Sequence, residues 1–175
     1  MGDRTTGVVL IGLRRAGKTT VGRQLAEGLG LPFADLDDAI ADRAGNSVAE
    51  IILKEGEAAF RKAESDALAL LVSRGPVVLA CGGGTPMVEG NRALLAGLGQ
   101  VLYLRIGVPE LLRRLHDDAD VSSRPPLLDC APEQEVREMW EARDPLFTQF
   151  ASQVVDGEGA VPTIVARCQD ALRAV

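Results

Sequence analysis

The sequence predicts a three-layer α/β fold, with a central parallel sheet of about five strands and helices on both faces. Short apolar runs alternate with longer amphipathic stretches, which is the pattern of successive βα units. The length of 175 residues fits one domain, because typical domains hold roughly 100 to 150 residues and a chain of this size buries a sizeable core. We therefore expect residues 1–175 to form a single domain.

Five short apolar runs are expected to be the strands. Each is bounded by a turn residue or by glycine, and the second run is opened by Pro32. Continuous apolar runs of this kind are typical of parallel strands that are covered on both faces. The expected strands are Val8–Ile11, Phe33–Leu36, Val77–Ala80, Val101–Ile106 and a short one at Val154 and Val155.

Amphipathic stretches between these runs predict the helices, one of which opens with Pro109, a residue tolerated in a first turn. The expected helices are Gly17–Leu29, Ala39–Ala44, Val48–Lys54, Glu57–Ser73, Pro109 to about His116, Pro132–Phe150 and Val161–Val175. The segment 117–132 combines aspartates, serines and three prolines without apolar periodicity, so it is expected to be a long loop. A loop of that length in a compact domain is usually functional or mobile, and we expect a mobile lid there.

Composition excludes several classes of protein. Hydrophobic residues make up 46% of the chain and charged residues 25%, as in an ordinary globular protein. The net charge of -6 argues against non-specific binding to nucleic acid or to an anionic membrane. The three cysteines are far apart without zinc-type spacing, and no secretory signal or membrane span is evident. We expect a cytoplasmic monomer that binds neither nucleic acid nor membranes.

The strongest motif is the segment 12–19, which reads Gly-Leu-Arg-Arg-Ala-Gly-Lys-Thr and satisfies the phosphate-loop pattern G-x-x-x-x-G-K-[ST] between a predicted strand and a predicted helix. Glycines let backbone N–H groups converge on phosphate oxygens, and the helix N-terminus adds partial positive charge. Lys18 can reach the β- and γ-phosphates of a nucleoside triphosphate, and the Thr19 hydroxyl suits Mg²⁺. The expected nucleotide-binding residues are Gly12, Arg14, Arg15, Ala16, Gly17, Lys18, Thr19 and Thr20.

Two aspartates follow the second predicted strand, at the end where open α/β sheets place their ligands. Asp35 and Asp37 are two residues apart, so in an extended segment their side chains share a face. One carboxylate can steady Mg²⁺ through its water shell, while the other accepts a hydrogen bond from a substrate hydroxyl and orients or deprotonates it. Alternatively, Asp37 or Asp38 is simply the N-cap of the next helix.

Two further segments can form the acceptor side of the site. Arg61 and Glu64 are three residues apart on one predicted helix, where the glutamate can hold the guanidinium as a fork for a carboxylate, although a solvated surface pair has the same spacing. Gly82, Gly83 and Gly84 follow the third predicted strand and leave bare backbone beside the phosphate loop. The glycines are also compatible with a tight exit turn.

Taken together and in this order, these segments resemble the shikimate kinases, members of the nucleoside monophosphate kinase group of P-loop folds. The resemblance runs from about Val8 to Phe147. It is carried by the phosphate loop and by five further segments: the F-x-D-x-D segment 33–37, the G-E-x-x-F-R-x-x-E segment 56–64, the glycines 82–84, the R-P-P-L-L segment 124–128 and the R-D-P-L-F segment 143–147.

The resemblance implies a kinase of the shikimate pathway, which leads to aromatic amino acids, with ATP and shikimate as substrates and Mg²⁺ as cofactor. It places Asp37, Arg61, Gly82, Gly83, Gly84 and Arg143 around shikimate. The implied catalytic residues are Lys18, Asp37 and Arg124, the last carried by the lid, and the implied metal residues are Thr19 and Asp35. Arg113 or Arg114 would lie against the adenine, and Glu64 would orient an arginine.

The chain departs from the family pattern at Arg15 in place of glycine, at the inserted Pro126, at Phe147 in place of tyrosine and at Ile52 in place of phenylalanine. None of these departures removes a residue that is assigned to the chemistry. Two alternatives stay open on the sequence alone. One is a related kinase for gluconate, quinate or aminoshikimate, and the other is a non-catalytic ATP-binding module.

Overall fold

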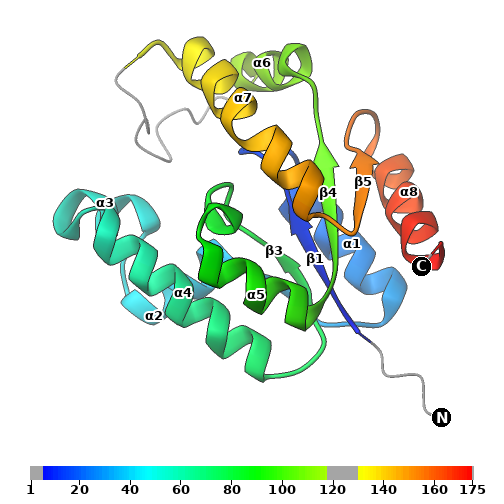
Figure 1. The fold of residues 1–175 in the computed structure, drawn as a ribbon, viewed down its shortest axis with the longest axis horizontal. Coiled ribbons are helices and arrows are strands. Elements are labelled where there is room, and N and C mark those ends of the chain that lie inside the picture. The colour runs from blue at the N-terminus through cyan, green and yellow to red at the C-terminus, as the bar shows by residue number, and fades with distance from the viewer. Residues whose placement is uncertain (1–5, 118–129, 175) are drawn as a thin grey trace.

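A five-stranded parallel sheet forms the middle layer in the computed structural model, which describes residues 6–117 and 130–174 (Figure 1). The strand order is β2-β3-β1-β4-β5, and every neighbouring pair is parallel. The predicted fold class is confirmed. The strands are β1 Gly7–Ile11, β2 Phe33–Asp35, β3 Val78–Ala80, β4 Gly99–Arg105 and β5 Gln153–Asp156.

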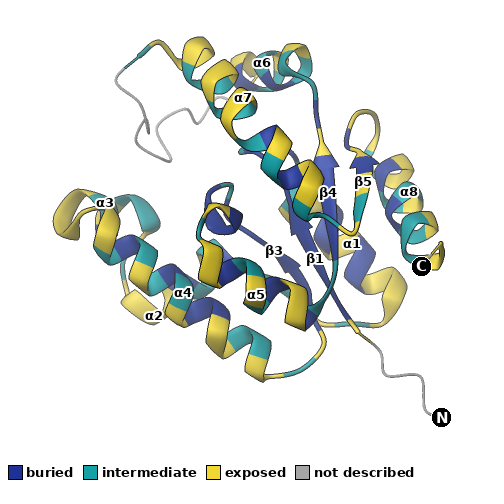
Figure 2. Cartoon of the chain, in the orientation of Figure 1, coloured by how far each residue is buried: buried dark blue, intermediate teal, exposed yellow. Residues whose placement is uncertain are grey.

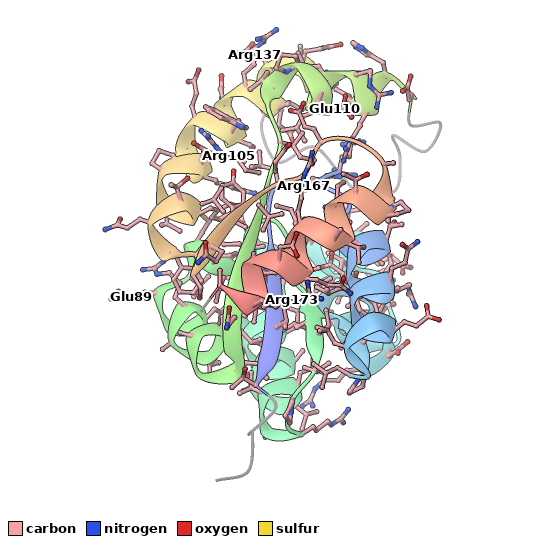
Figure 3. The ribbon with its side chains drawn as sticks, turned by 90° about the vertical axis from the view of Figure 1, so that its right-hand side faces the viewer. Glu89, Arg105, Glu110, Arg137, Arg167 and Arg173 are labelled. Atoms are coloured by element: carbon pink, nitrogen blue, oxygen red, sulfur yellow. The ribbon has the colours of Figure 1, made fainter. Side chains whose placement is uncertain are left out.

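Helices cover both faces of the sheet. Helices α1 and α8 pack together on one face, whereas α5 and α7 pack on the other, and α4 lies beside α5 (Figures 1 and 3). Helices α2 and α3 pack against α4 at one end of the molecule. The helices are α1 Lys18–Leu29, α2 Leu36–Ala44, α3 Val48–Glu55, α4 Glu57–Ser73, α5 Glu89–Leu98, α6 Val108–Asp117, α7 Pro132–Phe150 and α8 Val161–Arg173.

The core lies along the three central strands, which are almost entirely buried in Figure 2. In β1 all five residues are buried, because strands covered by helices on both faces have no solvent side. The register places Val9 beside Leu79 of β3 and Val101 of β4, so apolar side chains form continuous rows across the sheet. Because these neighbouring strands are parallel, the carboxyl ends of β2, β3 and β1 lie at the same edge of the sheet.

One part of the fold has no counterpart in the sequence prediction. Residues 85–98 form a 3₁₀ turn, Thr85–Met87, and then α5, where no element was expected. Helix α5 begins after Val88 without a side-chain cap and contains Gly90 and Gly97, which lower its intrinsic helix propensity. Burial of Leu95 and Leu98 against the sheet therefore stabilises this helix through tertiary packing.

The predicted lid, residues 117–132, lies mostly outside the described residues, which resume at residue 130. Helix α6 ends at its first residue and α7 begins at its last. Within residues 6–117 and 130–174, every helix is too short or too polar to cross a bilayer.

The turn between β1 and α1 has an unusual backbone. Gly12 and Gly17 have φ angles of 155° and 83°, and Arg15 has a φ of 66°. Among the described residues, Arg15 alone has a positive φ without being glycine. A side chain in this left-handed region is strained, because its Cβ approaches the following carbonyl oxygen at a cost of roughly 1–2 kcal/mol.

Replacing Arg15 with glycine is expected to raise the free energy of unfolding by about 1 kcal/mol, because glycine adopts this φ without strain. The measurement is the urea denaturation midpoint at constant slope. Arg15→Ala is the matched control, since it removes the same side chain but keeps the strained Cβ. Equal stability of the two variants would contradict the assignment of strain to this position.

Candidate active site

The phosphate loop lies between the end of β1 and the start of α1. A Cβ on Gly12 would lie 2.9 Å from the Leu104 carbonyl oxygen, so the loop can pack here only with glycine. The first turn of α1 has no side-chain cap, which leaves backbone N–H groups directed out of the helix N-terminus. The Lys18 ammonium donates to the carbonyl oxygens of Gly12 at 2.9 Å and Leu13 at 2.8 Å. Amides and an ammonium group are thus gathered in one loop, as anion binding requires.

Thr19 and Asp35, the predicted metal residues, are in contact. The Thr19 hydroxyl donates to Asp35 Oδ2 at 2.6 Å, which joins the first turn of α1 to the end of β2. Two oxygen ligands of this kind suit a hard divalent cation, which usually takes its remaining ligands from water and phosphate. Among the described residues no cluster of three or more carboxylate, histidine or cysteine side chains forms a separate metal site.

The structure corrects the predicted placement of Asp35 and Asp37 on one face of a strand. Strand β2 ends at Asp35, and α2 begins at Leu36, three residues earlier than predicted. Asp35 Oδ1 accepts the backbone N–H of Asp37 at 3.0 Å, so Asp35 is the N-cap, and the alternative that Asp37 or Asp38 caps this helix is wrong. Asp37 is instead held in the first turn of α2, beside Gly82.

The three glycines after β3 make room for side chains. Unlike Gly12 and Gly17, they do not have positive φ angles, so the turn itself does not require glycine. A Cβ on Gly84 would lie 2.8 Å from Arg61 Nη2, and one on Gly82 would lie 3.2 Å from Asp37 Oδ1. The segment 82–84 is therefore a strip of bare backbone on which polar side chains from several helices converge.

Arg61 lies across this strip and is held by a buried carboxylate. Its Nη1 donates to Glu64 Oε2 at 3.0 Å, and its Nη2 donates to Glu57 at 3.2 Å. The side chain of Glu64 is only 1% exposed and also accepts the Thr85 hydroxyl at 2.7 Å. The alternative of a solvated surface pair is thus wrong, because a buried glutamate with two donors fixes the guanidinium.

Arg143 reaches the same strip from α7. Its Nη1 donates to the Gly83 carbonyl oxygen at 2.9 Å. Burial lowers the pKa of Arg143, and the nearby charge of Arg61 lowers it further. Two guanidinium groups 82 residues apart in the sequence are therefore close enough to repel each other, and an anion between them would relieve that repulsion.

Two adjoining cavities occupy this region. The larger, of about 350 Å³, is lined by the phosphate loop, Thr20, Asp35, Asp38, Cys81 and the first glycines of the strip. The smaller, of about 60 Å³, is lined by Arg61, Glu64, Arg143, the glycine strip, Phe60, Val48 and Ile52. Both are also lined by Arg14, Asp37, Gly82 and Gly83, so Asp37 lies where the two cavities meet.

Arg114 and Arg113 differ in their surroundings, although either was expected near the nucleotide base. Arg114 donates to the Arg15 carbonyl oxygen at 3.0 Å and to that of Gly157 at 3.2 Å, so it joins the phosphate loop to the turn after β5. Arg113 is 61% exposed and pairs with Glu110 and Asp117. Hydrogen bonds from Arg113 and Arg114 lower the pKa of Glu110 to about 2.

Two of the predicted phosphate-loop residues, Gly12 and Ala16, are not found on the wall of either cavity. Ala16 is buried in the core, and Gly12 contributes its carbonyl oxygen to Lys18 rather than a surface to the cavity. Arg124 and the inserted Pro126 lie outside the described residues. Sequence reasoning missed Thr85, which supports Glu64, and Asp144, which follows Arg143 and binds β4. The sequence signal that could have indicated them is adjacency to predicted site residues, since Thr85 follows Gly84 and Asp144 follows Arg143.

Comparison with known proteins agrees with this geometry. The sequence model of the shikimate kinase family matches residues 14–173. A shikimate kinase from Cereibacter sphaeroides is 40% identical over 94% of this chain and 81% of its own length, and one from Nitratidesulfovibrio vulgaris is 41% identical over 94% of each chain. The solved structure of the Acinetobacter baumannii shikimate kinase in complex with shikimate superposes with a TM-score of 0.89, at 37% identity, over 97% of this chain and 93% of that one. The chain belongs to the shikimate kinase family.

Proposed function

We infer that this protein transfers the γ-phosphoryl group of ATP to the 3-hydroxyl of shikimate. The observation that carries the inference is the shared wall of the two cavities, because a phosphoryl donor in the larger one and an acceptor in the smaller one would meet at Asp37. Such proximity is what a kinase must supply, since phosphoryl transfer depends on position and charge compensation more than on covalent chemistry. The shikimate bound by the Acinetobacter baumannii relative supports the choice of acceptor.

The smaller cavity suits a compact organic anion. Arg61 and Arg143 supply two guanidinium groups, each a planar fork that pairs with a carboxylate through two hydrogen bonds. Ile52, Val48 and Phe60 form an apolar wall against which a carbon ring can pack. Shikimate combines a ring, one carboxylate and several hydroxyls, and so presents a group to each side of the cavity.

The acceptor hydroxyl and the transferring phosphoryl group would meet beside Asp37, between the two cavities. Asp37 accepts a hydrogen bond from the acceptor hydroxyl and orients it or removes its proton as the bond to phosphorus forms. Lys18 and the backbone amides of the phosphate loop compensate the charge on the transferring group. The role of Arg124 in closing over the phosphates stays a prediction, as do the cytoplasmic location and the monomeric state.

Mg²⁺ would be held at Thr19 and Asp35, whose oxygen atoms already lie 2.6 Å apart at the rim of the larger cavity. When bound with ATP, the cation neutralises charge on the β- and γ-phosphates. The protein contributes by holding the Thr19 oxygen on α1 and the Asp35 oxygen at the end of β2 in fixed positions.

A purified sample should release ADP with shikimate and Mg²⁺ and release almost none without an acceptor. Quinate, gluconate and aminoshikimate serve as competing acceptors in the same coupled assay. A higher kcat/KM for one of these three would assign the protein to that acceptor instead. Absence of ADP release with all four, despite ATP binding, would indicate a non-catalytic nucleotide-binding protein.

Replacing Arg61 with lysine is expected to raise the KM for shikimate by about tenfold and leave the KM for ATP unchanged. A single ammonium group cannot reproduce the fork that Glu57 and Glu64 hold in place. Lys62→Arg is the matched control, because Lys62 is the next residue, is 77% exposed and pairs only locally with Asp66. An unchanged KM in Arg61→Lys would remove this residue from the acceptor site.

The Asp35→Asn variant is expected to need about tenfold more Mg²⁺ for half-maximal activity, since loss of a supporting carboxylate typically weakens metal binding by 10- to 100-fold. Titration of Mg²⁺ at fixed ATP measures this requirement. The exposed Asp42 on α2 supplies the control, Asp42→Asn, which should behave as the wild type does. An identical Mg²⁺ dependence in all three proteins would contradict the proposed metal site.

A further inference from the structure

Arg143 depends on the rotation of α7 about its own axis. Successive residues of an α-helix lie about 100° apart around that axis, so Arg143 and Asp144 point in different directions. Arg143 reaches the Gly83 carbonyl oxygen, whereas Asp144 binds the side chains of β4. Whatever fixes Asp144 on β4 therefore also fixes the direction in which Arg143 points.

Asp144 is bound to β4 by three hydrogen bonds. Its Oδ1 accepts from the Tyr103 hydroxyl at 2.9 Å and from Arg105 Nε at 2.7 Å, and its Oδ2 accepts from Arg105 Nη2 at 2.9 Å. The paired contact with Arg105, which lies alongside α7 in Figure 3, fixes the plane of the carboxylate. Although burial opposes it, the bonds from Arg105 and Tyr103 hold the pKa of Asp144 below its usual value, so the group is charged.

The helix itself is weakened at this turn. Pro145 lies inside α7 and has no N–H, so the Glu141 carbonyl oxygen receives no helical hydrogen bond from it. Phe147 packs edge-on against Tyr103 with ring centroids 5.4 Å apart, but apolar contacts are non-directional and fix a helix's rotation less tightly than hydrogen bonds do. One turn earlier, Trp140 Nε1 donates to the Ile106 carbonyl oxygen at 2.9 Å, and at the turn that carries Arg143 the directional contacts with β4 are the hydrogen bonds of Asp144.

We propose that Asp144, bound by Tyr103 and Arg105, is a positioning residue that sets the rotation of α7 and so aims Arg143 at the carboxylate of the acceptor. The proposal rests on the proposed function, because the acceptor carboxylate is the group that Arg143 would bind. It assigns to β4 a part in acceptor recognition, although no β4 side chain lines the acceptor cavity among the described residues.

The test compares Asp144→Asn with the wild type. The substitution keeps the shape of the side chain but removes the charge that Arg105 binds. We expect the KM for shikimate to rise about tenfold, as loss of roughly one charge-assisted hydrogen bond would produce. The KM for ATP should stay within about twofold, and kcat should fall by less than about threefold. Tyr103→Phe keeps the ring against Phe147 and should shift the shikimate KM in the same direction by a smaller factor.

A binding measurement separates recognition from turnover. Trp140 is the one tryptophan of the chain and lies one turn before Arg143 on α7, so its fluorescence is the probe for a shikimate titration. The dissociation constant should rise in parallel with KM. In an Arg143→Ala background, Asp144→Asn should cause little further loss, because the two residues act through one contact.

The control for general destabilisation is Ile164→Ala, which removes buried atoms from α8 on the opposite face of the sheet. It should lower the melting temperature and leave the shikimate KM unchanged. If Asp144→Asn behaves in the same way, or if its effect is fully retained in the Arg143→Ala background, the positioning role is wrong. Wild-type protein that does not phosphorylate shikimate would contradict the proposed function as well, whereas an active wild type with an unaltered Asp144→Asn KM would contradict the positioning role alone.

Discussion

The site depends on close approach of charged side chains to the bare backbone of residues 82–84. Arg61 from α4, Arg143 from α7 and Asp37 from α2 all meet this strip, and a single Cβ on Gly84 would displace the Arg61 guanidinium. Side chains from three separate helices can share one cavity only because this short segment has no side chains of its own. The strip follows strand β3, which pairs with the central strand β1 and so places the strip beside the phosphate loop after β1.

The distribution of charge follows from the same constraint. The whole chain carries a net charge of -6, yet Lys18, Arg14, Arg61 and Arg143 are concentrated around the two cavities. Positive groups brought together in a partly buried place repel one another and lose hydration. Nearby carboxylates offset part of this cost: the buried Glu64 pairs with Arg61, and the charges of Glu135, Glu64 and Glu57 favour the charged form of Arg143.

The structure brings together those motifs whose placement has a local cause. The phosphate loop, the contact between Thr19 and Asp35, and the strip of glycines are each found where the order of strands and loops places them. The boundary between β2 and α2 was predicted wrongly, because Asp35, Asp37 and Asp38 are all good N-cap residues and only the folded chain shows which one accepts the backbone N–H. Helix α5 was missed because its stability comes from burial rather than from caps or propensity.

By itself, the sequence determined the α/β architecture through its apolar periodicity, and the order of its motifs showed the resemblance to the family, since periodicity and motif spacing involve residues that are close together in the chain. Only the tertiary structure decided that Arg61 is held by a buried Glu64, that Arg114 joins the phosphate loop to the turn after β5, and that Asp144 is anchored by Tyr103 and Arg105. These are contacts between residues 3 to 99 positions apart in the sequence, and whether such a pair is a buried anchor or a solvated surface pair depends on the packing around it. Packing is a property of the assembled layers, and no local pattern of residues encodes it.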